Sequence, residues 1–151
     1  MANTQALCTS FKGELLVGHH NFGTGVVRAA TTADTFKAAL YLASATINAS
    51  TTAYTATGEV SGTGYTAGGV TVTNGTAPAT SGTTAYWTPS ASITYSGVTL
   101  TTAFDCVLIY NSTQSNKAVS VHTFGSQTVT AGTFTLTMPT NDATTGLIRL
   151  A

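Results

Sequence analysis

FDCVLIY, at residues 104–110, is the most apolar run in a chain of 151 residues. Its length and its branched aliphatic side chains are typical of a buried central β-strand, which Asn111-Ser112 would end. Two shorter strand patterns precede it at residues 93–95 and 98–100. After it, residues 117–124 and 133–138 alternate apolar with polar side chains, as strands with one buried face do. The second half of the chain is therefore predicted to be antiparallel β-structure.

The first half of the chain adds further strand patterns. Residues 36–42 alternate in the same way, and residues 70–73 are followed by Asn74-Gly75, a strong hairpin-turn signal. Residues 83–88 and the terminal residues 146–151 complete a set of about eight strands. That number and spacing predict an all-β fold, an antiparallel β-sandwich of jelly-roll-like type.

The N-terminal segment has a different periodicity. Leu7, Phe11 and Leu15 recur every four residues, which places them on one face of a helix. We therefore expect a short amphipathic helix over residues 4–17. The chain would divide into an N-terminal helix and arm, 1–23, and a β-sandwich domain, 24–151.

The composition is poor in charge and rich in threonine. Charged residues make up 7% of the chain, five basic and five acidic, whereas 34 residues are threonine. Threonine suits a pleated strand and can face water without charge. A neutral surface tends to associate, which suits a subunit of an assembly. The sequence also offers no basic patch for nucleic acid, no apolar run of about 20 residues for a membrane, and no secretory signal.

The residues that could support chemistry are scattered. His122 and Asp105 could act as a base and an acid, but no nucleophile motif accompanies them. His19 and His20 are adjacent and remote from His122, and no Cys-x-x-Cys spacing indicates a metal site. The glycine-rich residues 58–64 lack the ending of a phosphate-binding loop. We expect no enzymatic activity, no metal, no cofactor and no disulfide framework, with Cys106 as a buried free thiol.

The sequence is compatible with two alternative binding surfaces. Four aromatic residues could form a platform for a sugar: Tyr54, Tyr86, Trp87 and Tyr95. Neighbouring strand residues face opposite sides, so either Tyr86 or Trp87 should belong to the core. The N-terminal helix could instead lie in a groove of a partner, or close one end of the sandwich.

Several motifs occur in an order that resembles a known family. They are Ala39-Leu40-Tyr41, Thr51-Thr52-Ala53-Tyr54, the block from Glu59 to Gly69 (EVSGTGYTAGG), Leu108-Ile109-Tyr110-Asn111, Asn116-Lys117-Ala118-Val119, Phe124-Gly125-Ser126, Ala131-Gly132-Thr133-Phe134-Thr135-Leu136 and Ile148-Arg149-Leu150. The series is similar to small virion structural proteins encoded among the head genes of tailed bacteriophages. It covers nearly the whole chain, and the block from Glu59 to Gly69 is its most specific part.

The resemblance implies a non-enzymatic protein present in many copies. Some phage proteins of this size and β-rich character are cement proteins that decorate the capsid exterior as dimers or trimers. The resemblance therefore implies that the partners are the major capsid protein and further copies of this chain, which would be made in the host cytoplasm. A tail or fibre component with a receptor-binding surface is the alternative, and a carbohydrate-binding module is a third class. The predicted contact residues lie in the two segments that do not fit strand alternation: Leu7, Phe11, Leu15, Glu59, Gly62, Gly64 and Tyr65.

Overall fold

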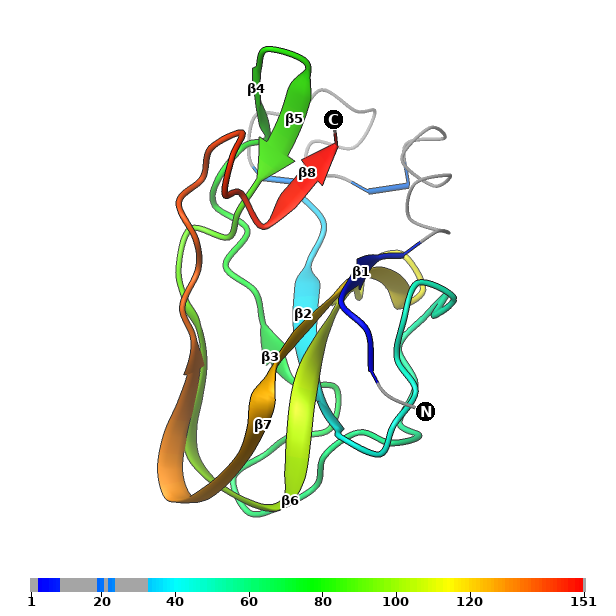
Figure 1. Ribbon diagram of the computed structural model, residues 1–151, viewed down its shortest axis with the longest axis vertical. Helices are drawn as coiled ribbons and strands as arrows, with labels where there is room; N and C mark the ends of the chain where they lie inside the picture. Colours follow the sequence, from blue (N-terminus) through cyan, green and yellow to red (C-terminus); the bar gives the residue numbers. More distant parts are fainter. Residues whose placement is uncertain (1–2, 9–18, 21, 24–32, 151) are drawn as a thin grey trace.

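The computed structural model describes residues 3–8, 19–20, 22–23 and 33–150, which form two antiparallel β-sheets (Figure 1). The larger sheet has the order β1-β7-β6-β2-β3, and the smaller has the order β4-β5-β8. The strands are β1 (Ala6–Leu7), β2 (Phe36–Leu42), β3 (Val70–Thr71), β4 (Ala79–Ser81), β5 (Thr84–Trp87), β6 (Ile93–Asn111), β7 (Lys117–Leu136) and β8 (Ile148–Leu150). The predicted all-β, antiparallel fold is confirmed.

β6 and β7 form one long hairpin, which replaces five of the predicted strands. The hairpin continues through Gly97 and through residues 101–103 (Thr-Thr-Ala), with register shifts between Tyr95 and Val98 and between Leu100 and Phe104. Bulges bend a strand pair without ending it. The prediction of separate strands at 93–95, 98–100 and 104–110 is therefore wrong, because residues that resemble loops bend this hairpin instead.

The bend divides the hairpin into two halves. We call residues 104–111 and 117–123 the proximal half, next to the connecting turn, and residues 93–100 and 129–136 the distal half. Both strands turn together at the lower left of Figure 1 and rise again along the left side. The Phe134 ring lies 5.0 Å from that of Phe104 and 5.2 Å from that of Phe124, measured between centroids. The two halves therefore face each other across aromatic side chains.

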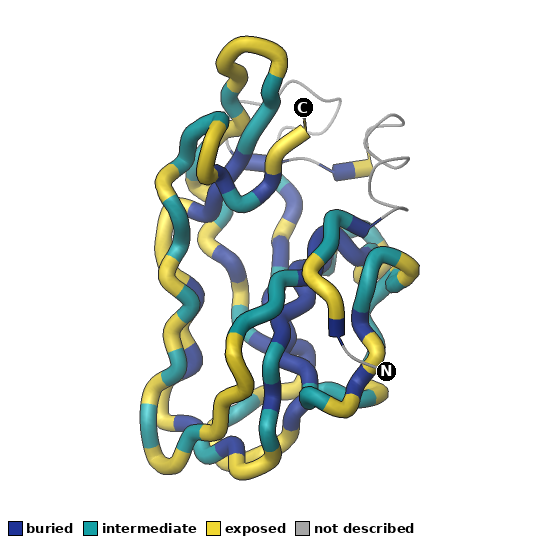
Figure 2. The backbone as a smooth tube through the Cα atoms, in the orientation of Figure 1, coloured by how far each residue is buried: buried dark blue, intermediate teal, exposed yellow. Residues whose placement is uncertain are grey.

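The core lies around β2 and the proximal half, where buried residues are concentrated (Figure 2). FDCVLIY is buried at every position except Asp105, which is partly exposed, so its prediction as a central strand is confirmed. The distal half alternates instead: Ile93 and Tyr95 are buried, and Thr94 is exposed. A continuous apolar run thus marks a strand covered on both faces, and alternation marks one with a solvated face.

The predicted helix over residues 4–17 differs from the structure at its start. Ala6 and Leu7 form β1, which pairs antiparallel with Val121 and Ser120. Leu7 packs against the core from this strand, and β1 covers part of an open sheet edge, so tertiary pairing overrides the four-residue periodicity. Residues 9–17 lie outside the described residues.

The Asn74-Gly75 signal does not close the predicted hairpin. β3 pairs with β2, whereas the hairpin of the smaller sheet joins β4 to β5. The Asn74 side chain instead donates a hydrogen bond to the Asp34 carbonyl at 3.0 Å. Asn74 therefore connects two loops through its side chain and does not close a hairpin turn between neighbouring strands.

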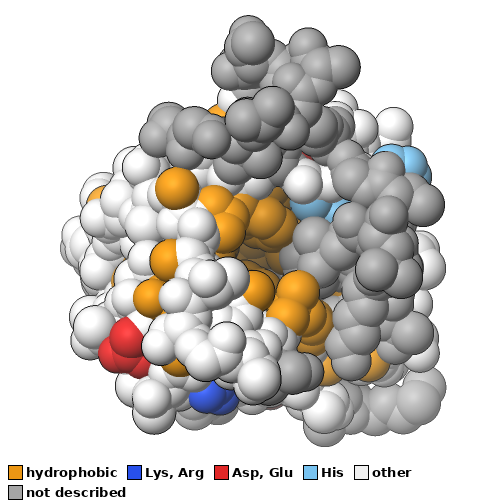
Figure 3. All heavy atoms as spheres, turned by 90° about the horizontal axis from the view of Figure 1, so that it is seen from above, with side chains coloured by type: hydrophobic (Ala, Val, Ile, Leu, Met, Phe, Trp, Pro, Cys, Tyr) orange, Lys and Arg blue, Asp and Glu red, His pale blue; other side chains and the backbone are white. Residues whose placement is uncertain are grey.

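The smaller sheet lies at the upper end of the molecule in Figure 1. Trp87 of β5 is buried, with its ring centroid 4.8 Å from that of Phe22 and 5.9 Å from that of Phe36. Viewed from above, this end shows hydrophobic side chains inside a hollow with histidine beside them (Figure 3). The sheet is therefore joined to the core on one side and borders a hollow on the other.

Candidate functional site

Glu59, in the block that carries the most specific resemblance, is the centre of a hydrogen-bonded cluster. Its carboxylate accepts from the Tyr54 hydroxyl at 2.6 Å, the Tyr65 hydroxyl at 2.7 Å and the Gly68 backbone N–H at 2.7 Å. We call these four residues the Glu59 cluster. A carboxylate that accepts three good hydrogen bonds is satisfied within the fold.

The tyrosines link this cluster to the sheet. The Tyr65 hydroxyl also accepts from the Leu40 N–H of β2 at 3.1 Å, and the Tyr110 hydroxyl donates to the Gly68 carbonyl at 2.8 Å. Burial raises the pKa of Tyr65, and burial together with Glu59 raises that of Tyr54 to about 12. Both phenols therefore stay protonated and serve as donors at neutral pH.

Gly62 and Gly64 let the same loop lie directly against β6. A Cβ at Gly62 would come 2.0 Å from the Thr99 carbonyl oxygen, and one at Gly64 would come 2.3 Å from that of Gly97. Gly64 also has a φ of +77°, a left-handed conformation that favours glycine. The two glycines are thus required where the loop backbone approaches the distal half.

The predicted contact residues therefore have defined places in the fold. The side chains of Glu59 and Tyr65 bond within the Glu59 cluster, and Leu7 packs against the core. Phe11 and Leu15 lie outside the described residues. Contact with a partner at these positions stays a prediction, and the exposed neighbours of the cluster, such as Ser61 and Thr66, are the side chains of this loop that face solvent.

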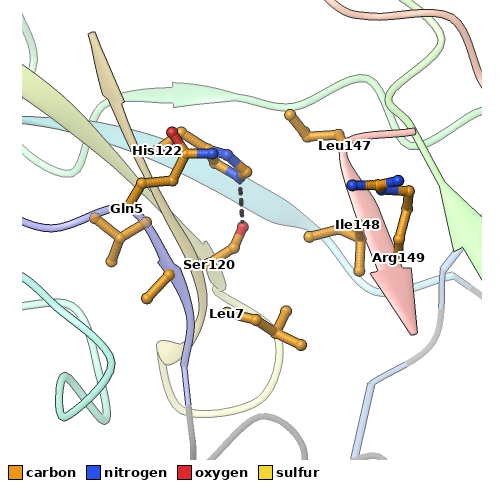
Figure 4. A pocket seen from close by; sticks show the side chains of 9 residues that line it. Gln5, Leu7, Ser120, His122, Leu147, Ile148 and Arg149 are labelled. Atoms are coloured by element: carbon orange, nitrogen blue, oxygen red, sulfur yellow. Dashed lines mark hydrogen bonds between the residues drawn. The ribbon is translucent and has the colours of Figure 1, made fainter. Parts of the chain in front are cut away.

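A second candidate site is a hollow of about 230 Å³ between β1, β7 and β8 (Figure 4). The Ser120 hydroxyl and His122 Nε2 lie 2.9 Å apart on its wall, and Leu7, Ile148 and Arg149 also line it. The serine and the histidine are two positions apart in one strand, which places both side chains on the same face. That spacing could have indicated the contact from the sequence.

His122 and Leu147 also line a second, more apolar hollow of about 130 Å³. Burial lowers the pKa of His122 to about 4, so the imidazole is neutral at neutral pH. Ser120 itself is only 1% exposed. Asp105, the other half of the acid–base pair considered above, accepts a hydrogen bond from the Asn3 side chain at 2.6 Å. The absence of catalysis stays a prediction.

A buried polar cluster joins the N-terminal arm to the end of the central hairpin. Asn111 donates to an Asp34 carboxylate oxygen at 2.8 Å, and its amide nitrogen lies 3.2 Å from His20 Nδ1. Gln114 approaches the other Asp34 oxygen at 3.3 Å. Polar residues scattered over 95 positions meet here, so no local sequence pattern could have predicted the cluster. It stabilises the turn at residues 112–116, because Asn111 also accepts from two backbone N–H groups there.

The aromatic platform considered for a sugar is not formed. Trp87 and Tyr95 are each 2% exposed, which confirms that one residue of the Tyr86–Trp87 pair belongs to the core. Tyr54 stacks on Tyr110 with centroids 4.9 Å apart. These side chains pack in different parts of the core, so they offer no common surface.

Among the described residues, no group of three or more His, Cys, Asp or Glu side chains could hold a metal ion, and Cys8 and Cys106 are both buried. No helix in this part of the chain is long and apolar enough to cross a membrane. In comparisons with known proteins, no family model, no curated protein and no solved structure matches this chain.

Proposed function

We propose that this chain is a non-enzymatic structural protein of a tailed-bacteriophage virion, which binds the major capsid protein and stabilises the shell from outside. The first support is the series of sequence motifs that, in their order along the chain, resemble phage head proteins. The proposal includes a jelly-roll-like sandwich, which the two antiparallel sheets support. The N-terminal helix is not part of it, since residues 6–7 form a strand.

The observation that carries the proposal is the role of the Glu59 to Gly69 block. Part of this block bonds or packs within the chain: the Glu59 carboxylate accepts hydrogen bonds from inside the fold, and Gly62 and Gly64 lie against β6. A motif used in this way specifies a shape rather than a reaction. Likeness in such a motif therefore supports likeness in a structural role.

The surface supports the same role. No charged residue occurs between Lys117 and Asp142, a stretch that includes most of β7. Solvent-facing positions such as Thr94, Thr133 and Thr135 carry hydroxyl groups instead. Contacts repeated by the symmetry of a shell can each be modest, and a surface without charge repulsion permits them.

The first test locates the protein in purified virions. Quantitative mass spectrometry of virions and of separated tailless heads should find hundreds of copies that stay with the heads. A protein that is scarce and absent from tailless heads would contradict capsid decoration and favour the tail or fibre alternative.

The second test asks whether the loop at residues 59–69 contacts the shell. We expect the purified protein to bind undecorated capsids, and Ser61→Arg, an exposed substitution in the loop, to weaken binding at least about tenfold. Thr101→Arg is the matched control, because Thr101 is also exposed but lies at the hairpin bend. Deletion of residues 1–18 is less suitable, since it would remove β1 and the hydrogen bonds of Asn3.

A further inference from the structure

The outer edge of β7 is open along the distal half. β6 pairs with one side of β7, whereas β1 pairs with the other side only at Val121 and Ser120. The chain then leaves this edge, because the Thr4 N–H donates to the Ile47 carbonyl at 3.2 Å. Within the described residues, no strand pairs with this side of β7 from Thr123 to Leu136.

The corresponding edge of β6 is partly covered. The Thr99 N–H donates to the Thr63 carbonyl at 2.8 Å, and the backbone at Gly64 lies against Gly97. The Glu59 cluster holds this covering loop in place. The two strands of the distal half therefore differ, and β7 presents the more accessible backbone groups.

The open edge lacks the charge that usually protects such edges. Soluble proteins prevent strand-to-strand association with lysine or other charges, prolines and bulges. No charged residue lies between Lys117 and Asp142. A bulge occurs at Ala131, where φ is +46°, and Pro139 follows the strand. These two features leave the segment Gly132–Met138 between them without protection.

This segment is self-complementary when it runs antiparallel to a second copy. Its central residue is Thr135, so a two-fold axis there would place Thr135 beside its own copy and Phe134 beside Leu136 of the other chain. The threonines at 133, 135 and 137 are exposed, whereas Phe134, Leu136 and Met138 are partly buried on the core side. Hydroxyl groups would thus meet hydroxyl groups, and apolar side chains would meet apolar side chains.

We infer that a second copy of this chain binds along the open edge of β7 and the two residues that follow it, by antiparallel pairing of the two Gly132–Met138 segments about a two-fold axis near Thr135. The zero net charge of the chain and the neutral edge remove electrostatic repulsion between copies. Two edges of this length bury less than the standard interface of about 1,600 Å². The dimer should therefore form at micromolar or higher concentration, and be favoured further where a shell holds many copies close together.

This inference deepens the proposed function by naming the contact through which copies associate. It concerns purified protein in solution, without capsids. A failure of dimerisation would leave capsid binding untouched, and a failure of capsid binding would leave the dimer untouched.

The test uses opposite charges at Thr135. Sedimentation equilibrium of the full chain should show a monomer–dimer equilibrium, and Thr135→Lys or Thr135→Asp should each weaken it at least about tenfold, because like charges would meet at the axis. An equimolar mixture of the two variants should dimerise again. Thr101→Lys, which adds the same charge at the exposed hairpin bend, should dimerise as the unmodified chain does.

A second measurement tests the same contact without the charged variants, in case these variants fail to fold. Thr135→Cys under mild oxidation should give a disulfide-linked dimer, whereas Thr101→Cys should not; Cys8 and Cys106 are buried in the fold. A chain that stays monomeric at millimolar concentration would overturn the inference. A dimer that persists in both charged variants and gives no crosslink at position 135 would also overturn it.

Discussion

The proximal and distal halves of the β6–β7 hairpin share the same two strands but have opposite surroundings. β2 pairs with β6 throughout the proximal half, and residues 106–110 are buried at every position. In the distal half β6 and β7 pair with each other, and exposed residues alternate with apolar residues that are buried in β6 and partly buried in β7. Strand pairing is common to both, so the difference lies in what covers the faces and edges. The proximal half therefore contains most of the buried core, whereas the distal half has the exposed face and edge to which we assign the proposed dimer contact.

The largest difference should appear when leucine is shortened in each half. Leu108→Ala in the proximal half should cost about 3–4 kcal/mol of unfolding free energy, because the side chain is fully buried and would leave a cavity. Leu136→Ala makes the same change at a partly buried distal position and should cost about 1 kcal/mol. Urea unfolding followed by fluorescence of Trp87, the single tryptophan, measures both. Equal costs would contradict the comparison.

Removal of the Glu59 carboxylate should loosen the connection between the two halves. Glu59→Ala leaves three donors without their acceptor and should cost about 3 kcal/mol, whereas Glu59→Gln keeps an acceptor oxygen and should cost about 1 kcal/mol. Because Tyr65 bonds to Leu40 of β2 and stacks on Tyr95 of β6, amide exchange should accelerate mainly in residues 93–100. Uniform acceleration across both halves would argue against this role.

Acid should destabilise the chain through His122, which lies in the proximal half beside the hollow. Its pKa is about 4 when folded, below the value of about 6.5 expected in the unfolded chain. The unfolded state therefore binds more protons between these values, and stability present above pH 6.5 is lost as the pH falls toward 4. The loss should reach roughly 2 kcal/mol, allowing for partial exposure of the ring. His122→Gln should flatten this part of the stability–pH curve; an unchanged slope would exclude His122 as its cause.

The smallest effect should come from the exposed face of the distal half. Thr135→Lys should change the unfolding free energy of the monomer by less than about 0.5 kcal/mol, because the side chain projects into solvent. Urea unfolding at a concentration too low for dimers tests this. A loss above 1 kcal/mol would show that the face contributes to folding.

Much of the fold could be predicted because the buried face of a strand requires apolar residues at a regular spacing in the sequence. FDCVLIY and residues 36–42 were recognisable as strands, and the alternation at 133–138 indicated a solvated face. The predicted breaks at Gly97 and Thr101-Thr102 failed, because polar and glycine residues are compatible with both loops and bends. The helix predicted at Leu7 was wrong for a related reason. A four-residue period indicates a helix only if no open sheet edge can pair with the same segment.

The candidate sites were less predictable. The Glu59 to Gly69 block was identified by likeness, but its hydrogen bonds to Tyr54 and to β2 depend on loops meeting in space. Two of the predicted contact side chains, Glu59 and Tyr65, form hydrogen bonds within the fold, which the sequence did not indicate, and their contact with a partner stays a prediction. The Ser120–His122 contact had a local signal in its spacing, whereas the cluster of His20, Asp34 and Asn111 had none.

The sequence by itself determined the class of fold and the nature of the exterior: alternating strands, abundant threonine and almost no charge follow from composition and period. Only the tertiary structure decided that five strand patterns join into one bent hairpin, which side chains satisfy Glu59, and which edge of β7 no described strand pairs with. The physical reason is the range of the interactions. Side-chain alternation is set between neighbouring residues, whereas edge pairing and buried hydrogen bonds join residues that are far apart in the chain.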